Sequence, residues 1–424
     1  MNYKKGYKSM KWFFRKEIEI PQEWEIRKLN ELYNLEKGKV PSELSDKCDS
    51  NFEPYLSTDN LDREKTIFAK KENCVLIKES DVIIIGDGTG SGRTYTGKNG
   101  VLSSTCLVFR KQNDQIMNHF LYHILTEKYK LFKNTKYGTS IPHIDKYFVT
   151  ELPIPLPSLQ EQQKIVTVLS NVDSLIESTN KIIKNSKSLK TGLMQEQLTR
   201  GIGHTKFKKV PWLFGKNIEI PEKWEIKTLN ELSKNGTQNG YAISKNDYGN
   251  GFQIVGMTDL FKNDILKENN LKEIKLPKEK IQKFFLDKKD LLFARRSLNI
   301  EGAGKCIMVS DLKKETIFES SIIRISINKL HYSSTYVNYF MNSDIGKRAM
   351  TRIKQIVAVS GITSSDLKKI KIIIPKKDEQ EKIVTVLSNV DSLIESQIKY
   401  KEKLEKLKKS LIQKLLTGEV RVKV

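Results

Sequence analysis

The chain has 424 residues, and its 74 lysines and arginines against 51 acids give a formal net charge of +23. This length predicts two or three domains, each large enough to bury a core. The basic excess favours a polyanionic partner such as nucleic acid, with a solvated lysine surface as the alternative. No run of 18 apolar residues occurs, which excludes a membrane-spanning helix.

The cysteines argue against a zinc or disulfide framework. None of the four belongs to a CxxC pair, and three of them fall in the first half of the chain. Reduced thiols are typical of a cytoplasmic protein, and the basic, polar N-terminal sequence contains no apolar signal region. We therefore expect a cytoplasmic location.

The first predicted element is an entry motif that occurs twice. Residues 18–32 read IEIPQEWEIRKLNEL and residues 218–232 read IEIPEKWEIKTLNEL, with eleven of fifteen positions identical. A long internal repeat of this kind predicts two domains of one fold.

A variable block follows each entry motif, at about 33–150 and 233–370. The two blocks share little sequence, but they share an order of predicted elements: strand, Gly- and Arg-bearing loop, strand, amphipathic helix and closing strand. The predicted ranges are 82–85, 106–109, 116–132 and 152–156 in the first block, and 291–294, 322–327, 334–350 and 370–375 in the second.

A long helix is predicted after each block. Residues 164–178 and 382–396 carry the same fifteen letters, KIVTVLSNVDSLIES, and apolar residues continue beyond them at intervals of three and four. This spacing predicts a coiled-coil seam, with Thr179 and Ser186 as polar interruptions. The predicted seam residues are Ile165, Val168, Val172, Leu175, Ile182 and Leu189 in the first helix, and Ile383, Val386, Val390, Leu393, Leu404 and Leu407 in the second.

Proline and glycine mark the ends of these helices. Pro157-Ser158 and Pro375 precede them, and Gly201 and Gly418 follow them. Each helix has about 40 residues and is therefore roughly 60 Å long. The two could pair antiparallel within the chain, or each could pair with another protein.

The sequence therefore predicts an α+β protein with a pseudo-two-fold internal repeat. Two similar globular domains of mixed sheet and helices, 1–157 and 202–375, are separated by the long helices 158–201 and 376–424, which form an antiparallel coiled coil.

The sequence offers little catalytic chemistry. Residues 92–98 match the phosphate-binding pattern G-x-x-x-x-G-K, but Asn99 replaces the hydroxyl residue that would bind magnesium, and a strand pattern follows. A loop that approaches DNA, or a plain hairpin tip, fits better. His119 and His123 share a helix face, but no third metal ligand accompanies them, so packing or surface roles are favoured. We predict no catalytic residue and no metal site.

Basic residues of the two loops are the candidate DNA contacts. Arginine can bind guanine through two hydrogen bonds, and lysine and threonine can hold phosphates. For each residue, a solvated surface charge is the alternative. The candidates are Arg93, Thr94 and Lys98 in the first half and Arg295, Arg296 and Lys305 in the second.

Over nearly its whole length the chain resembles the specificity (S) subunits of type I restriction–modification systems. One shared motif is Ile20-Pro-x-x-Trp24-Glu-x-x-x-Leu29, repeated at 220–229. The other opens each long helix, as Pro155-Leu-Pro157…Glu161-Gln162-x-Lys164-Ile165 and as Pro375…Glu379-Gln380-x-Lys382-Ile383. The second copy departs from the pattern by having Ile-Ile-Ile-Pro-Lys-Lys at the strand-to-helix junction.

The resemblance implies a non-catalytic DNA specificity subunit. Each block would be a target recognition domain that reads one half of a bipartite, asymmetric site in double-stranded DNA. The helices would set the spacing and dock methyltransferase (M) subunits, two being expected. S-adenosylmethionine would bind to those partners, and ATP and magnesium would serve a restriction (R) subunit, so no cofactor is expected in this chain. A self-contained methyltransferase or nuclease, or an architectural coiled-coil protein, are the alternatives.

Overall fold

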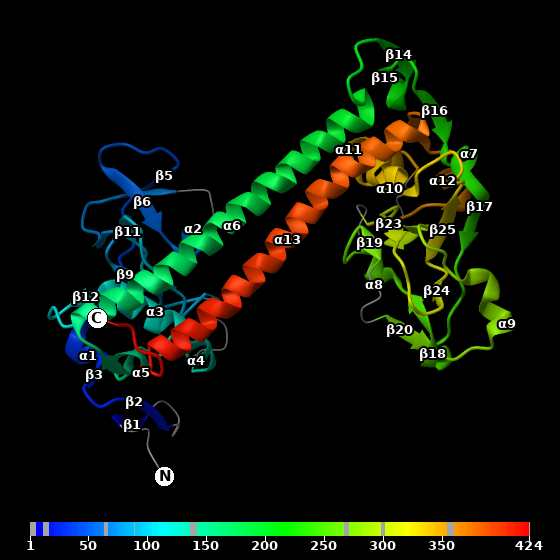
Figure 1. The fold of residues 1–424 in the computed structure, drawn as a ribbon. Coiled ribbons are helices and arrows are strands. Elements are labelled where there is room, and N and C mark those ends of the chain that lie inside the picture. The colour runs from blue at the N-terminus through cyan, green and yellow to red at the C-terminus, as the bar shows by residue number, and fades with distance from the viewer. Residues whose placement is uncertain are drawn as a thin grey trace. The chain divides into compact units, whose positions relative to one another are not determined.

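The structure is a computed structural model that describes residues 6–11, 17–62, 67–88, 90–135, 142–266, 271–297, 302–353 and 360–423. Its contacts form two compact units: unit 1 is Met1–Asn180 with Lys399–Val424, and unit 2 is Lys181–Ile398. Two long helices, α6 (Leu159–Arg200) and α13 (Lys377–Leu415), each contribute residues to both units (Figure 1). Within the described residues, no helix is long and apolar enough to cross a membrane.

Unit 1 contains two larger sheets and several short helices. One sheet has the order β10-β9-β12-β4 and the other the order β5-β7-β6-β11-β8, while β1 pairs with β2 and β3 with β13. The strands are β1 (Tyr7–Lys11), β2 (Glu17–Pro21), β3 (Glu25–Lys28), β4 (Tyr33–Lys37), β5 (Leu44–Ser45), β6 (Phe52–Leu56), β7 (Phe68–Lys70), β8 (Leu76–Ile77), β9 (Val82–Ile85), β10 (Thr94–Tyr95), β11 (Gly100–Leu102), β12 (Cys106–Lys111) and β13 (Pro153–Leu156). The helices are α1 (Leu29–Leu32), α2 (Thr58–Asp62), α3 (Asn118–Glu127), α4 (Tyr129–Asn134) and α5 (Lys146–Thr150).

Unit 2 repeats this plan. Its sheets have the orders β17-β25-β21-β23-β19 and β20-β18-β24, and three further strand pairs are β14-β15, β16-β27 and β22-β26. The strands are β14 (Phe207–Pro211), β15 (Asn217–Pro221), β16 (Glu225–Thr228), β17 (Ser233–Asn239), β18 (Tyr248–Val255), β19 (Ile265–Leu266), β20 (Lys272–Ile274), β21 (Leu291–Ala294), β22 (Arg296–Ser297), β23 (Cys306–Val309), β24 (Thr316–Phe318), β25 (Ile322–Ile327), β26 (Ser360–Gly361) and β27 (Lys371–Ile374). The helices are α7 (Leu229–Leu232), α8 (Met257–Leu260), α9 (Lys278–Ile281), α10 (Ser334–Asn342), α11 (Asp344–Thr351) and α12 (Ser364–Lys368), with 3-10 turns η1 (Leu213–Gly215), η2 (Lys245–Asp247) and η3 (Gln282–Phe284).

The same antiparallel trio of strands lies at the centre of each unit. In unit 1, β12 lies between β9 and β4, and in unit 2, β25 lies between β21 and β17. All four residues of β9 and of β21 are buried, as expected for continuous apolar runs covered on both faces. The predicted α+β class and internal repeat are confirmed.

The amphipathic helices predicted at 116–132 and 334–350 were wrong in one respect, because each is two helices. The first is divided at Lys128 and the second at Ser343. The Ser343 hydroxyl accepts a hydrogen bond from the Gly346 N–H at 3.3 Å and so caps α11. Apolar spacing continues across both breaks, which is why the sequence pattern suggested single helices.

Segments of α6 and α13 run antiparallel within each unit. In unit 1 Asp173 pairs with Lys408 at 2.5 Å, and in unit 2 Asp391 pairs with Lys190 at 2.7 Å. The two ion pairs are copies of one contact, because the 218-residue offset of the repeated helices relates Asp173 to Asp391 and Lys190 to Lys408. The predicted antiparallel pairing is confirmed within each unit.

The predicted seam, however, was wrong at five positions. Thr179 and Ser186, expected as interruptions, are 3% and 7% exposed and belong to the buried face of α6. The Thr179 hydroxyl donates to the Leu175 carbonyl at 2.7 Å, so its burial leaves no unpaired donor. Two apolar stripes with a seven-residue period adjoin on each helix, and sequence spacing alone did not select the buried one. The five residues that were predicted for the seam but are instead 43–54% exposed are Leu175, Ile182, Leu189, Leu393 and Leu407.

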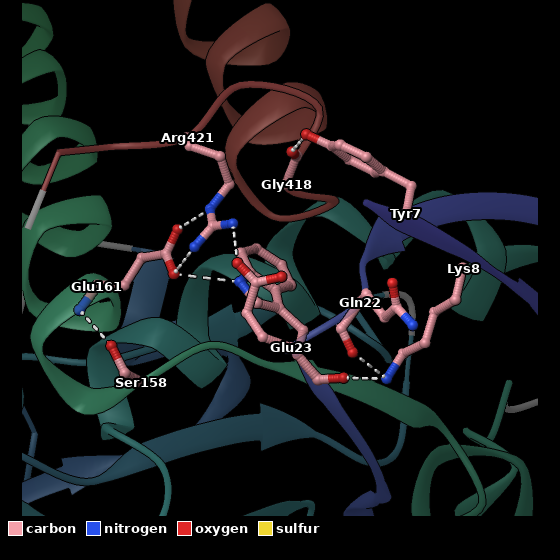
Figure 2. Close-up of polar contacts among 9 residues, drawn as sticks. Tyr7, Lys8, Gln22, Glu23, Ser158, Glu161, Gly418 and Arg421 are labelled. Atoms are coloured by element: carbon pink, nitrogen blue, oxygen red, sulfur yellow. Dashed lines mark hydrogen bonds and ion pairs between the residues drawn. The ribbon is translucent and has the colours of Figure 1, made fainter. Parts of the chain in front are cut away.

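In unit 1 the buried carboxylate of Glu161 connects three segments that are distant in the sequence (Figure 2). We call this set of contacts joint 1. Glu161, at the start of α6, accepts a hydrogen bond at 3.1 Å from the indole N–H of Trp24 in the entry motif. Arg421, beyond the end of α13, donates to Glu161 through Nε at 2.6 Å and Nη2 at 2.9 Å. Its guanidinium also pairs with Glu23 and lies over the Trp24 ring.

Joint 2 in unit 2 has the same construction. Glu379, at the start of α13, accepts the indole N–H of Trp224 at 3.0 Å. The place of Arg421 is taken by His204, beyond the end of α6, whose Nε2 lies 2.7 Å from Glu379 Oε1. The Ile202 N–H also donates to this oxygen at 3.3 Å.

A glycine follows each long helix where the chain passes over the joint. Gly201 and Gly418 both have φ +69°, a conformation that favours glycine. A Cβ on Gly201 would lie 2.6 Å from Glu379 Oε1, and one on Gly418 would lie 2.4 Å from a ring carbon of Pro21. The predicted glycine stops are therefore required by close packing as well as by φ.

The glutamine of each helix-opening motif connects the helix to its own block. Gln162 accepts the Met117 N–H at 2.9 Å, and Gln380 accepts the Ser333 N–H at 2.8 Å. Both residues are fully buried, and their amide groups also donate to carbonyls just before their helices. The Glu-Gln pair thus fixes each helix start through two different side chains.

Replacing Arg421 with alanine should destabilise unit 1 by about 2 kcal/mol, because Glu161 would stay buried without its cation. Partial exposure of Arg421 keeps the loss below that of a fully buried pair. Chemical unfolding of the full chain measures the change. The matched control is Arg27→Ala, which removes a surface arginine paired with Glu25 and Glu31 and should cost below about 1 kcal/mol. Equal losses in both variants would contradict a special role for joint 1.

Candidate nucleic-acid interface

The turn after β9 in unit 1 and the turn after β21 in unit 2 occupy equivalent positions. In unit 1 the Ile144 N–H donates to the Gly86 carbonyl, and in unit 2 the Ile362 N–H donates to the Arg295 carbonyl, both at 2.9 Å. Gly86 and Arg295 are therefore matched positions. The residues that follow them are Asp87 and Arg296.

In unit 2 this turn presents two arginines. The backbone of Arg295 is fixed on both sides, since its N–H donates to Ser321 O at 2.8 Å and its carbonyl accepts from Ile362. Arg296 is exposed in β22, where it pairs with Gly361 of β26. Neither guanidinium forms an ion pair or hydrogen bond with any of the described residues. Both arginines predicted as DNA contacts are thus presented by a fixed backbone.

In unit 1 an acid takes the matched place. Asp87 Oδ1 lies 2.7 Å from His143 Nδ1, and Lys37 donates to Asp87 Oδ2 at 3.2 Å. Burial alone would raise the pKa of Asp87, but the hydrogen bonds from His143 and Lys37 outweigh it and hold the pKa below its ordinary value. Asp87 is therefore an ionised hydrogen-bond acceptor at neutral pH.

The three candidates of the first loop differ in exposure. Arg93 and Lys98 are exposed, one directly before β10 and the other three residues after it. The Thr94 hydroxyl is buried and has no hydrogen-bond partner, so it does not face solvent. Arg93 and Lys98 stay candidate DNA contacts, whereas Thr94 is not placed to meet a phosphate.

Unlike Arg295 and Arg296, Lys305 has partners for its charged group within unit 2. Its ammonium pairs with Asp264 and donates to Asn342 Oδ1 at 3.0 Å, so the cation is already neutralised within unit 2. Lys305 lies directly before β23, where its carbonyl accepts the Ala294 N–H at 2.9 Å, but its ammonium is directed to Asp264 and Asn342.

Sequence reasoning missed Asp87, His143 and Lys37 as a group. The available signal was the 218-residue offset, which aligns Ile144 with Ile362 and so places His143 beside the turn that bears Asp87. The hydrogen bond joins residues 56 positions apart, so no local pattern reveals it.

Comparison with known proteins agrees with this architecture. The family described as type I restriction modification DNA specificity domain matches residues 21–186 and 221–406. The type I restriction enzyme MjaVIII specificity subunit of Methanocaldococcus jannaschii is 30% identical over 413 residues, which cover 96% of this chain and 95% of that protein. The EcoKI specificity subunit of Escherichia coli is 23% identical, with 95% and 90% covered. The chain belongs to the type I specificity family.

A solved structure shows the same fold. The S subunit of a type I restriction–modification system from M. genitalium matches with a TM-score of 0.58 at 14% identity, covering 92% of this chain and 96% of that one. Among the residues of the present chain that the structure describes, no cluster of three or more histidine, cysteine, aspartate or glutamate side chains could hold a metal ion.

The two histidines of α3 do not converge. His119 is exposed, whereas His123 is 1% exposed and neither of its ring nitrogens has a hydrogen-bond partner. Its counterpart in unit 2 is Tyr339, because Met117 and Ser333 bind the matched glutamines and each residue lies six positions further along its helix. Tyr339 donates to Asp391 at 2.7 Å, a contact with α13 that His123 does not reproduce with α6.

His123 should make the stability of unit 1 depend on pH. Burial, with the nearby charges of Lys408 and His119, lowers the pKa of His123 to about 3. An unfolded histidine titrates near about 6.5, so below that pH the unfolded chain binds a proton that the folded unit excludes. Stability present above about pH 6.5 is lost as the pH falls toward 3, by about 2 kcal/mol between pH 7 and pH 5.

The variant His123→Leu should lack this part of the pH dependence, whereas the exposed neighbour variant His119→Gln should keep it. Denaturant unfolding at pH 7 and pH 5 measures both. If wild type and His123→Leu lose the same stability on acidification, the buried histidine does not control it.

Proposed function

We propose that each unit reads one half of a bipartite, asymmetric DNA site, and that the long helices set the spacing between the half-sites. The observation that carries the proposal is one framework used twice, with different side chains at matched surface positions, such as Asp87 and Arg296. The net charge of +23 supports a DNA partner. An arginine favours guanine, while an ionised aspartate can only accept hydrogen bonds, as from the amino group of cytosine. Units that differ in this way would read two DNA half-sites of different sequence.

Catalysis belongs to partner subunits in this proposal. The chain would act within a complex, in which methyltransferase subunits bind S-adenosylmethionine and a restriction subunit uses ATP and magnesium. Its own residues bind and orient DNA, which requires positively charged and hydrogen-bonding side chains rather than a nucleophile.

Exchanging residues 33–150 for the matching block of another specificity subunit should change one half-site only. The central strands and loops lie within the block, while joint 1 and both helices stay outside it. Mapping methylated sites in DNA treated with the reconstituted complex gives the answer. Exchange of 233–370 is the reciprocal control and should change the other half-site. A change in both halves after a single exchange would refute reading by separate units.

The exposed apolar stripe of the helices is the proposed docking surface for methyltransferase subunits. Two of its members, Leu189 and Leu407, stand one residue before the lysines that pair with the other long helix, Lys190 and Lys408. In an antiparallel pair, such positions of both helices flank the same side of the contact. The stripe occurs twice at the 218-residue offset. In unit 1 it comprises Leu175, Tyr400 and Leu407, and in unit 2 Ile182, Leu189 and Leu393.

The substitutions Leu189→Glu and Leu407→Glu should each remove one of two bound methyltransferase subunits. Each leucine is about half exposed, so the charge should leave the chain folded. Losing one buried leucine contact weakens binding by at least about tenfold. Native mass measurement should give one methyltransferase per chain for each single variant and none for the double variant.

The control is Ser174→Glu, which adds the same charge on α6, the helix of Leu189, but outside the stripe. It should leave two subunits bound. Full occupancy in the double variant would exclude the stripe as the docking surface.

A further inference from the structure

Unit 2 contains a polar, basic cleft. The cleft has a volume of about 710 Å³ and lies between α12, the end of β17 and the turn after β21. Three of its lining residues are cations and none is a carboxylate. It is lined by Thr228, Asn230, Asn239, Arg295, Thr363, Ser364, Ser365, Lys368 and Lys369.

The cations of the cleft are only partly neutralised. Lys369 lies 3.6 Å from Asp366, a carboxylate that also accepts the Thr363 hydroxyl at 2.7 Å. Arg295 and Lys368 form no ion pair with any residue that the structure describes. The positive charge of the cleft is therefore available to an external anion.

None of the three matched positions in unit 1 carries a cation; they are Gly86, Thr150 and Glu151. The 218-residue offset places Glu151 where unit 2 has Lys369, and Gly86 stands where unit 2 has Arg295. Glu151 binds Lys28 at 2.7 Å and Asn30 at 2.8 Å, and the hydrogen bond from Lys28 holds the pKa of Glu151 below its ordinary value. In unit 1 an internal carboxylate thus already occupies the donors of this region.

The donors of the cleft suit a phosphate. A guanidinium, two ammonium groups and several hydroxyls and amides provide many hydrogen-bond donors around one space, and no lining carboxylate would repel an anion. The neighbouring Arg296 is exposed on β22, directly after Arg295 in the chain. A backbone bound at the cleft would therefore lie next to a residue able to read a base.

We infer that this cleft binds backbone phosphates of duplex DNA, so that unit 2 supplies electrostatic affinity at a place where unit 1 does not. The inference rests on the proposed function, because it assumes that unit 2 approaches DNA. Phosphate contacts carry no sequence information but fix the register of a reader on the duplex. Each phosphate neutralised adds about −0.9 to the slope of log K against log salt concentration.

The test uses the full chain assembled with its methyltransferase subunits and fluorescent duplexes, one with the target site and one without. Binding is measured between about 50 and 200 mM salt. The triple variant Arg295→Ala, Lys368→Ala, Lys369→Ala should make the slope shallower by about 2 to 3. Affinity should fall for both duplexes by a similar factor, leaving their ratio almost unchanged.

The matched control removes three lysines that are exposed and already paired elsewhere in unit 2: Lys278→Ala, Lys288→Ala, Lys314→Ala. It loses the same net charge and should change the slope much less. An equal change in both triple variants, or an unchanged slope in the cleft variant, would overturn the inference.

A single variant guards against misfolding of the triple variant. Lys369→Glu places a negative charge at an exposed position, as Glu151 does at the matched position of unit 1. It should lower affinity for both duplexes severalfold while the unfolding temperature stays the same. Unchanged affinity would count against the cleft. If the wild-type complex itself does not distinguish the target from the unrelated duplex, the proposed function fails instead.

Discussion

The hydrogen bond from an entry-motif tryptophan to a helix-opening glutamate is the contact on which each unit depends. Glu161 and Glu379 are withdrawn from solvent, and a buried carboxylate is tolerated only when its oxygens are paired. Trp24 or Trp224 donates to one oxygen, and a nitrogen-bearing side chain beyond the other long helix, Arg421 or His204, pairs with the other. Each joint therefore brings the start of one long helix together with the segment after the end of the other, so each unit needs residues from both helices.

The duplication, the central strands and the helix starts could be predicted because they rest on local patterns. The seam could not, since two apolar stripes with one period adjoin on α6 and the buried one contains Thr179 and Ser186. The two side chains that complete the joints could not be predicted for another reason. Arg421 and His204 differ in type, so comparing letters did not align them. Asp87 and His143 meet only through tertiary packing, and Lys305 is withdrawn by Asp264, which no spacing rule contains.

The two units place different charges on equal backbones. Glu151 and Lys369 follow matched short helices, and Gly86 and Arg295 accept the same backbone hydrogen bond. Because the backbone is held by buried strands and by the joints, surface substitutions change the charge without moving the frame. This is the physical condition for one duplicated fold to recognise two different sequences. A symmetric pair of readers would be limited to identical half-sites.

The helix pair by itself leaves apolar surface unused. Its seam includes Thr179, Ser186 and the ion-paired Lys190 and Lys408, which stabilise a coiled coil less than leucine would. On the adjoining apolar stripe, Leu175, Leu189, Leu393 and Leu407 are about half exposed. A pair built only to hold two domains would gain from the reverse arrangement, with leucines inside and polar residues outside. The observed order makes sense when further helices cover the stripe, because the apolar side chains then lie inside a larger bundle. The same heptads would hold the chain together and bind its partners.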